Sequence, residues 1–241
     1  SKMDVPMRHP YAGKLVFTAF SGSHQDAINK GMQAMHEKNQ EWWEVPYLPI
    51  DPSDIGREYE PIVRINSQSG KGGVAFVMDS EFGYKLPKRM HKEFADVIQK
   101  IAEEQGEVAP ATIMEVFEKE YLRKKTPYEF IRAKAEDVAE NETEVEVVFM
   151  AGEELKSAKA VGNGPLAALK KLMADETGMD FTLVDYSQHA LSKGSEAKAA
   201  AYICLHDNRT GKETYGVGVS ANITRAGFRA FFSAVDRLIE N

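Results

Sequence analysis

The spacing of hydrophobic residues changes about halfway along the chain, and the change predicts a helical first half and a sheet-rich second half. Between residues 86 and 105 the apolar positions recur every three or four residues, as on a helix with one buried face: Met90, Phe94, Val97, Ile98 and Ile101. Residues 144–150 instead alternate polar and apolar side chains, which is typical of a half-buried strand.

The first half is predicted to consist of helices separated by irregular segments. A Ser-His-Gln-Asp capping pattern at 23–26 indicates the start of a helix, and Gly106 is expected to end another. The predicted helices span about 24–38, 73–79, 86–105 and 110–122. The segments between them are an extended entry at 1–20, a proline-rich connection at 39–61 with one short helical turn after Asp51-Pro52, and a glycine loop at 69–73.

The second half contains an internal repeat. The pattern predicts strands at about 128–137, 143–150 and 154–161 and a helix at 164–177, and then strands at 180–187, 197–206 and 213–219 and a helix at 223–239. The fold class is therefore α+β: mainly helical subdomains followed by a domain of two βββα units. The charged segment before Pro127 places the domain boundary between 1–126 and 127–241.

Composition and charge narrow the possible functions. The net charge is −7, which argues against a nucleic-acid partner, and no apolar run is long enough to span a membrane. The single cysteine, Cys204, excludes an internal disulfide and fits a cytoplasmic location. Because the sequence begins with Ser1 and not with Met, we expect it to be a piece of a longer protein.

Most common catalytic signatures are missing from the sequence. The six histidines form neither an H-x-H pair nor an i, i+4 pair, so no metal site is expected in this chain. There is no G-x-S-x-G elbow for a hydrolase. The run Gly70-Lys71-Gly72-Gly73 lacks the spacing of a phosphate-binding loop, and a mobile glycine loop is the favoured interpretation.

Two segments remain as candidate sites. His24 lies at a predicted helix N-terminus, where the helix dipole favours a neutral imidazole that can act as a base; the alternative is a capping segment with a solvated histidine. The turn Gly162-Asn163-Gly164-Pro165 precedes a helix whose first amides could bind a carboxylate, and nearby alanines leave room for a small apolar group. The alternative is a tight strand-to-helix turn.

Longer motifs resemble the 2-isopropylmalate synthase family, in particular its long actinobacterial and fungal type. In the first half these are residues 9–13, 20–31, 43–52 and 65–73, which resemble the linker subdomains. In the second half residues 162–168, Asp185-Tyr186, His189-Ala190 and 216–219 resemble the regulatory domain. The likeness extends over essentially the whole chain.

The resemblance implies an activity for the full-length protein. The family condenses acetyl-CoA with 2-oxoisovalerate to form 2-isopropylmalate and CoA, the first committed step of leucine biosynthesis. The chemistry takes place in a TIM barrel that holds a divalent metal (Zn, Mg or Mn), and this barrel is expected to precede the present chain. The chain alone is therefore expected to lack a cofactor and to be inactive.

The same resemblance implies roles for individual residues. His24 and Tyr47 match a histidine and a tyrosine that cross over in the homodimer and reach the active site of the partner. The regulatory domain binds L-leucine, which inhibits the enzyme. The implied leucine site consists of Gly162, Asn163, Gly164, Pro165, Leu166, Ala167, Tyr186, Ala190, Ala197, Val219 and Ala221. Ala221 stands where many members have proline. We expect Gly162→Val and Ala190→Leu to fill this site and to relieve inhibition.

Two other functions are weighed against this one. A citramalate- or homocitrate-type synthase would share the regulatory domain but respond to another effector, such as isoleucine. A stand-alone amino-acid sensor would carry no enzyme at all. The long motif around His24 favours the 2-isopropylmalate enzyme, because a sensor would not need it.

Overall fold

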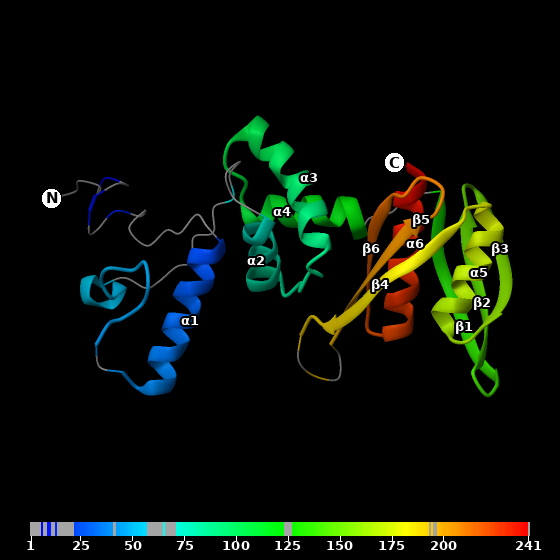
Figure 1. The fold of residues 1–241 in the computed structure, drawn as a ribbon, viewed down its shortest axis with the longest axis horizontal. Coiled ribbons are helices and arrows are strands. Elements are labelled where there is room, and N and C mark those ends of the chain that lie inside the picture. Colours follow the sequence, from blue (N-terminus) through cyan, green and yellow to red (C-terminus); the bar gives the residue numbers. More distant parts are fainter. Residues whose placement is uncertain are drawn as a thin grey trace. The chain divides into compact units, whose positions relative to one another are not determined.

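The computed structural model describes residues 6, 9, 10, 13, 22–40, 42–56, 65, 71–122, 127–192, 194 and 197–240. The chain divides into two compact units. The first comprises Ser1–Phe82 and Lys88–Met114, and the second comprises Gly83–Pro87 and Glu115–Asn241 (Figure 1). The short segment 83–87 therefore interrupts the first unit and packs as part of the second. The functional boundary after residue 126 remains a prediction.

The first unit is helical in its described residues. Its helices are α1 (Gly22–Lys38), α2 (Lys71–Phe82) and α3 (Met90–Gln105), and α4 (Pro110–Phe117) begins in it. Ile28 of α1 packs with Val45 and Leu48 in a small core. The predicted turn after Asp51 is confirmed as a 3₁₀ turn, Pro52–Ile55, in which the Asp51 carboxylate accepts a hydrogen bond from the Ser53 amide at 2.9 Å.

The predicted helices of this unit are confirmed, but several of their ends differ. Helix α1 includes Ser23 in its first turn, so Ser23 is not the N-cap residue. Lys71, Gly72 and Gly73 begin α2 and are not part of a loop, whereas residues 66–70 lie outside the described residues, as does nearly all of the predicted entry segment 1–20. Helix α3 begins at Met90 and not at 86.

The exclusion of residue 86 from α3 has a local cause. The ring of Pro87 disfavours the helical conformation at the residue before it, so Leu86 stays outside the helix. The other end of α3 agrees with the sequence. Gly106 ends it with a positive φ of 86°, and its amide donates to the Ala102 carbonyl oxygen at 2.9 Å. Helix α4 continues into a π-helical turn, Glu118–Leu122.

The second unit contains the predicted repeat. Strands β1 (Tyr128–Ala139), β2 (Glu142–Ala151) and β3 (Glu154–Gly162) form one antiparallel sheet, which is followed by α5 (Pro165–Thr177). Strands β4 (Phe181–Ala190), β5 (Ala199–Asp207) and β6 (Glu213–Ser220) form the second, which is followed by α6 (Ile223–Glu240). The α+β class and the two βββα units are therefore confirmed.

One continuous core joins both sheets and both helices. It includes Val147 and Phe149 of β2, Leu169 of α5, Ile203 of β5 and Phe232 of α6, all completely buried. The second sheet approaches α6 very closely, because an added Cβ at Gly218 would lie only 2.1 Å from the Ala226 carbonyl oxygen. Gly216 lies equally close, because an added Cβ there would be 2.2 Å from the Ala230 carbonyl oxygen. The two glycines let α6 pack directly on the backbone of β6.

Strand β5 is buried on both of its faces. Its residues from Ala200 to Leu205 have no exposed surface. Helix α6 packs on one side of the sheet. The π-helical turn packs against β6 and also contacts α6, because its Tyr121 carbonyl oxygen accepts a hydrogen bond from the Ser233 hydroxyl at 2.8 Å. On the face of β4 that His189 occupies, the Lys85 amide of the segment 83–87 donates a hydrogen bond to the His189 ring.

Candidate functional site

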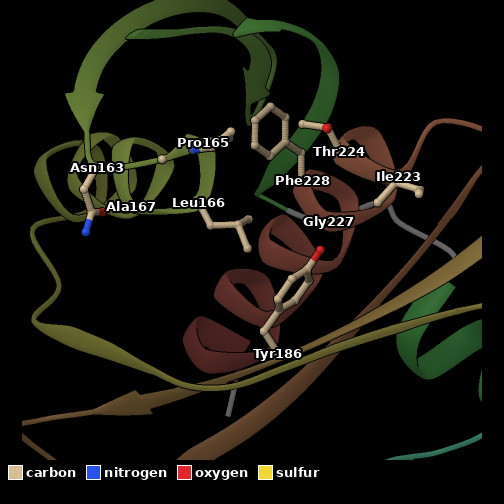
Figure 2. Close-up of a pocket in the computed structure, with 10 residues that line it drawn as sticks. Asn163, Pro165, Leu166, Ala167, Tyr186, Ile223, Thr224, Gly227 and Phe228 are labelled. Carbon is tan, nitrogen blue, oxygen red and sulfur yellow. The ribbon is translucent and has the colours of Figure 1, made fainter. Parts of the chain in front are cut away.

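A cavity of about 360 Å³ opens between the N-terminal ends of α5 and α6 and strand β4 (Figure 2). Three parts of the chain line it: the turn and first residues of α5, one side chain of β4, and the first turns of α6. The lining residues are Asn163, Gly164, Pro165, Leu166, Ala167, Tyr186, Ile223, Thr224, Gly227 and Phe228. None of these ten residues is acidic or basic.

Helix α5 presents hydrogen-bond donors to the cavity. Gly164 is its N-cap residue, makes no side-chain capping bond and is followed by Pro165 at the first helical position. The first bond of the helix runs from the Ala168 amide to the Gly164 carbonyl oxygen at 3.0 Å. The amides of Leu166 and Ala167 precede that bond and sit at the positive end of the helix, where an anionic group is favoured.

Helix α6 contributes shape more than charge. Its N-terminus is capped by its own sequence, because the Asn222 side chain accepts a hydrogen bond from the Arg225 amide at 2.9 Å. Gly227, one turn further on, leaves space for a ligand. A Cβ at this position would lie 3.6 Å from the Tyr186 hydroxyl oxygen and 3.7 Å from Leu166 Cδ2, which is ordinary contact.

Tyr186 forms the wall opposite α6. Figure 2 shows its ring pointing from β4 toward the helix. Its hydroxyl donates to the Gln188 side-chain oxygen at 2.8 Å. Burial raises the pKa of the Tyr186 phenol above its ordinary value, which already lies well above neutrality, so the hydroxyl keeps its proton. An apolar hollow with amide donors at one end can take a small molecule that carries both a carboxylate and an apolar side chain.

The structure brings six of the eleven predicted site residues together in this cavity: Asn163, Gly164, Pro165, Leu166, Ala167 and Tyr186. The other five do not line it. Val219 and Ala221 lie at and after the end of β6, and Ala197 lies in the β4–β5 connection. Ala190 shares a face of β4 with Tyr186 but lies four residues further along, about 13 Å away.

Gly162 has a packing role, which agrees with the alternative interpretation of this segment as a tight strand-to-helix turn. A Cβ at this position would lie 2.4 Å from the Ala168 backbone nitrogen of α5. Gly162→Val would therefore disturb the packing of α5 on β3 and would not fill the cavity. Ala190→Leu would place its side chain too far along β4 to enter the cavity. Neither substitution would fill this cavity, and their effect on inhibition stays a prediction.

Sequence reasoning missed the contribution of α6. Ile223, Thr224, Gly227 and Phe228 line the cavity, although only the turn before this helix had been considered. The internal repeat held the signal. Each βββα unit ends in a helix after a similar turn, so the N-termini of α5 and α6 are equivalent positions in the repeat. A candidate site at the N-terminus of α5 therefore made the N-terminus of α6 a candidate part of its lining.

His24 and Tyr47 form a second candidate site, in the first unit. Their rings stack with centroids 4.1 Å apart and an interplanar angle of 27°. Tyr47 is 61% exposed and has a positive φ of 64°, which costs a non-glycine residue energy. An exposed, stacked pair with a strained backbone is typical of residues held ready for a partner or substrate.

The described part of the chain offers no metal centre or membrane segment. Within it, no three His, Cys, Asp or Glu side chains are grouped where they could hold a metal ion. None of its helices is long and apolar enough to cross a membrane.

Comparison with known proteins finds similar sequences along nearly the whole chain. A family model described as "Alpha-isopropylmalate synthase, post-catalytic domain-like" matches residues 14–79, and one described as "LeuA allosteric (dimerisation) domain" matches residues 107–239. A protein of Clostridium acetobutylicum named 2-isopropylmalate synthase is 46% identical over 243 residues, which are 98% of this chain and 43% of that protein.

Two further relatives carry the same name. The protein of Corynebacterium glutamicum is 43% identical over 261 residues, covering 100% of this chain and 41% of the relative. The protein of Mycobacterium leprae is 45% identical over 251 residues, covering 98% of this chain and 40% of the relative. The chain thus spans about two fifths of the length of the curated relatives it matches.

Proposed function

The chain belongs to the LeuA allosteric (dimerisation) domain family, and on this premise we propose that it is the linker and leucine-binding regulatory region of a 2-isopropylmalate synthase. The complete enzyme would condense acetyl-CoA with 2-oxoisovalerate in a metal-dependent catalytic barrel. The names of the relatives and the post-catalytic match over residues 14–79 support this assignment.

The cavity of the second unit is the proposed leucine site. The amides of Leu166 and Ala167 would bind the carboxylate, and Leu166, Tyr186 and Phe228 would surround the isobutyl group. Burying roughly 100 Å² of apolar surface contributes about 2.5 kcal/mol, so the contacts to the carboxylate must supply the rest of the affinity. No carboxylate lines the cavity, so the ammonium group of leucine would donate hydrogen bonds to neutral oxygens of the lining residues or to water.

The observation that carries this proposal is the meeting of an uncapped helix N-terminus and an apolar hollow in one cavity. Calorimetric titration of the chain with L-leucine, with L-isoleucine as the control ligand, tests it. Saturable binding of leucine alone is expected. Preference for isoleucine would instead indicate a citramalate-type enzyme, and binding of neither would contradict the assignment of the cavity.

The variant Gly227→Leu tests whether leucine binds in this cavity. Its Cβ fits without a clash, and the longer side chain would occupy the ligand's space. Leucine binding should be lost while the fold is kept. Gly72→Leu is the matched control, because Gly72 is also a helical glycine but an added Cβ there would meet nothing within 4 Å. Undiminished leucine binding by Gly227→Leu would place the effector elsewhere.

The His24–Tyr47 pair is the part we propose to act in catalysis. In a homodimer it would enter the partner's active site and position or polarise the substrate. The stacking of the two rings and the exposure of Tyr47 support a role at an interface. The homodimer is supported by the description of the matched family as a dimerisation domain. The cytoplasmic location stays a prediction.

A further inference from the structure

Strand β4 carries two different functional groups on its two faces. Tyr186 faces α6 and lines the cavity, whereas His189, three residues further along, lies on the opposite face because successive side chains alternate. On that opposite face His189 meets the segment 83–87, which joins α2 to α3. The same short strand therefore borders the proposed leucine site and a segment that connects two helices of the first unit.

The imidazole of His189 is held by three contacts. Its Nδ1 lies 3.1 Å from the Ala190 carbonyl oxygen, and its Nε2 lies 3.0 Å from the Tyr202 hydroxyl oxygen. The Lys85 amide donates to the same Nε2 at 3.1 Å. The ring also stacks on Tyr202 at 5.6 Å. Such a set of partners fixes both the position and the orientation of the ring.

These contacts determine which nitrogen carries the proton. A backbone amide can only donate, so Nε2 must be the acceptor of the Lys85 hydrogen bond. Nδ1 then carries the hydrogen and donates it to the Ala190 carbonyl oxygen. The hydrogen bond from the Lys85 amide therefore requires that the His189 ring carries its hydrogen on Nδ1, has Nε2 free to accept, and lies within reach of that amide.

The two ends of this bond differ in how firmly they are held. The neighbours of Lys85, Tyr84 and Leu86, are buried with 8% exposure each. Within the described part of the chain β4 lies at the edge of its sheet and pairs with β5 alone, and Val184 and Tyr186 are 36% and 40% exposed. Since the residues of β5 from Ala200 to Leu205 are completely buried, β4 can move more easily than β5, and a ligand packed against Tyr186 would restrict that movement.

We propose that His189 is the positioning residue that couples the proposed leucine site on β4 to the segment 83–87. This inference rests on the proposed function, because leucine is the ligand whose binding it transmits. Leucine against Tyr186 holds β4 in the position from which His189 accepts the Lys85 hydrogen bond. The segment 83–87 is continuous with α2, which packs against α1, the helix that carries His24.

Hydrogen exchange of the Lys85 amide in the whole 241-residue chain measures this bond directly. Saturating L-leucine should slow that exchange about fivefold or more, in the usual range of allosteric coupling. His189→Phe keeps a ring on Tyr202 but removes the acceptor, and should make Lys85 exchange rapid and insensitive to leucine. His189→Gln, whose side-chain oxygen can replace Nε2, should restore part of the response.

Thermodynamic reciprocity sharpens the test. If leucine strengthens the Lys85 bond by a given factor, loss of the bond must weaken leucine binding by the same factor. The Kd ratio of His189→Phe to the unsubstituted chain, measured by calorimetry, should therefore equal the leucine-induced change in Lys85 protection. A purely structural role for His189 would not produce this equality.

The outcomes separate the coupling from the leucine site itself. Leucine binding without any change at Lys85 would overturn the coupling and leave the proposed function intact. A leucine response that persists in His189→Phe would also overturn it. If the unsubstituted chain binds no leucine, the proposed function fails and the coupling fails with it, even where His189→Phe still frees the Lys85 amide.

Discussion

The glycines of the second unit face their neighbours at very different distances, and these distances predict opposite effects of the same substitution. A Cβ at Gly218 would lie 2.1 Å from a backbone oxygen of α6, whereas one at Gly227 would meet nothing closer than 3.6 Å. Gly218→Ala should lower the free energy of unfolding by about 1–3 kcal/mol through overpacking. Gly227→Ala should raise it by about 0.5–1 kcal/mol, because alanine favours the helix.

Urea unfolding of both variants checks this pair. Gly72→Ala serves as the control for helix propensity, because an added Cβ there lies in open space. A neutral Gly218→Ala variant would show that β6 and α6 are not as close as the structure has them.

Tyr84 predicts a dependence of stability on alkaline pH. Burial, with a smaller contribution from the charge of Glu118, raises the pKa of its phenol. As the pH rises above the ordinary tyrosine value, the unfolded chain loses this proton before the folded chain does, so the free energy of unfolding falls with pH. Tyr84→Phe should reduce that fall by up to about 1.4 kcal/mol per pH unit. Unfolding in urea between pH 8 and pH 11 measures it, and identical slopes would contradict the assignment.

Tyr47 provides the test of the proposed catalytic pair. Tyr47→Phe keeps the ring that stacks on His24 but removes the hydroxyl group. In the intact synthase this change should lower kcat by roughly 10²- to 10⁴-fold if the hydroxyl takes part in proton transfer. Leucine affinity should stay the same, because Tyr47 does not line the cavity. Unchanged kcat would limit Tyr47 to a structural role.

At the scale of whole elements, the N-terminus of α6 depends on one side chain. The Asn222 side-chain oxygen accepts a hydrogen bond from the Arg225 amide, and the Asn222 backbone carbonyl oxygen accepts one from the Ala226 amide. Asn222→Ala should therefore cost about 0.5–2 kcal/mol of folding free energy, whereas Asn222→Asp, which keeps the acceptor, should cost little. Thermal unfolding followed by circular dichroism distinguishes them. Equal loss in both variants would show that the carboxamide has another role.

The secondary structure of the second unit could be predicted because its signals are local. Alternation in β2 and the helical spacing in α6 are properties of each segment alone. The prediction that α3 begins at residue 86 was wrong because Pro87 restricts the backbone of the residue before it, and a hydrophobic pattern does not register that steric effect.

The lining of the candidate cavity could be predicted only in part, for a related reason. The turn before α5 carries its own signature of glycine and proline, so its residues were found. Gly227 lines the cavity only because α6 packs beside α5 and β4, which no local pattern reports. Conversely, Ala190 was chosen for its small size, but the length of β4 places it away from the cavity.

At the scale of the whole molecule, the segment 83–87 interrupts the first unit in sequence but packs as part of the second, and this arrangement affects how the chain unfolds. Each unit has its own core, so the chain is not expected to unfold in a single two-state step. Since the proposed leucine site lies wholly in the second unit, the ligand should stabilise that unit directly. At one hundred times its Kd, leucine should add about 2.7 kcal/mol to the folding free energy of the second unit.

Differential scanning calorimetry of the chain with and without leucine resolves where that stabilisation goes. The transition of the second unit, identified by parallel circular dichroism as the one that removes the β-sheet signal, should move to higher temperature as leucine is added. The transition of the first unit should move less, and only through the segment 83–87. In Gly227→Leu neither transition should respond, whereas Gly72→Leu should behave like the unsubstituted chain. Equal shifts of both transitions would mean that the two units unfold together, and that leucine acts on the chain as one body.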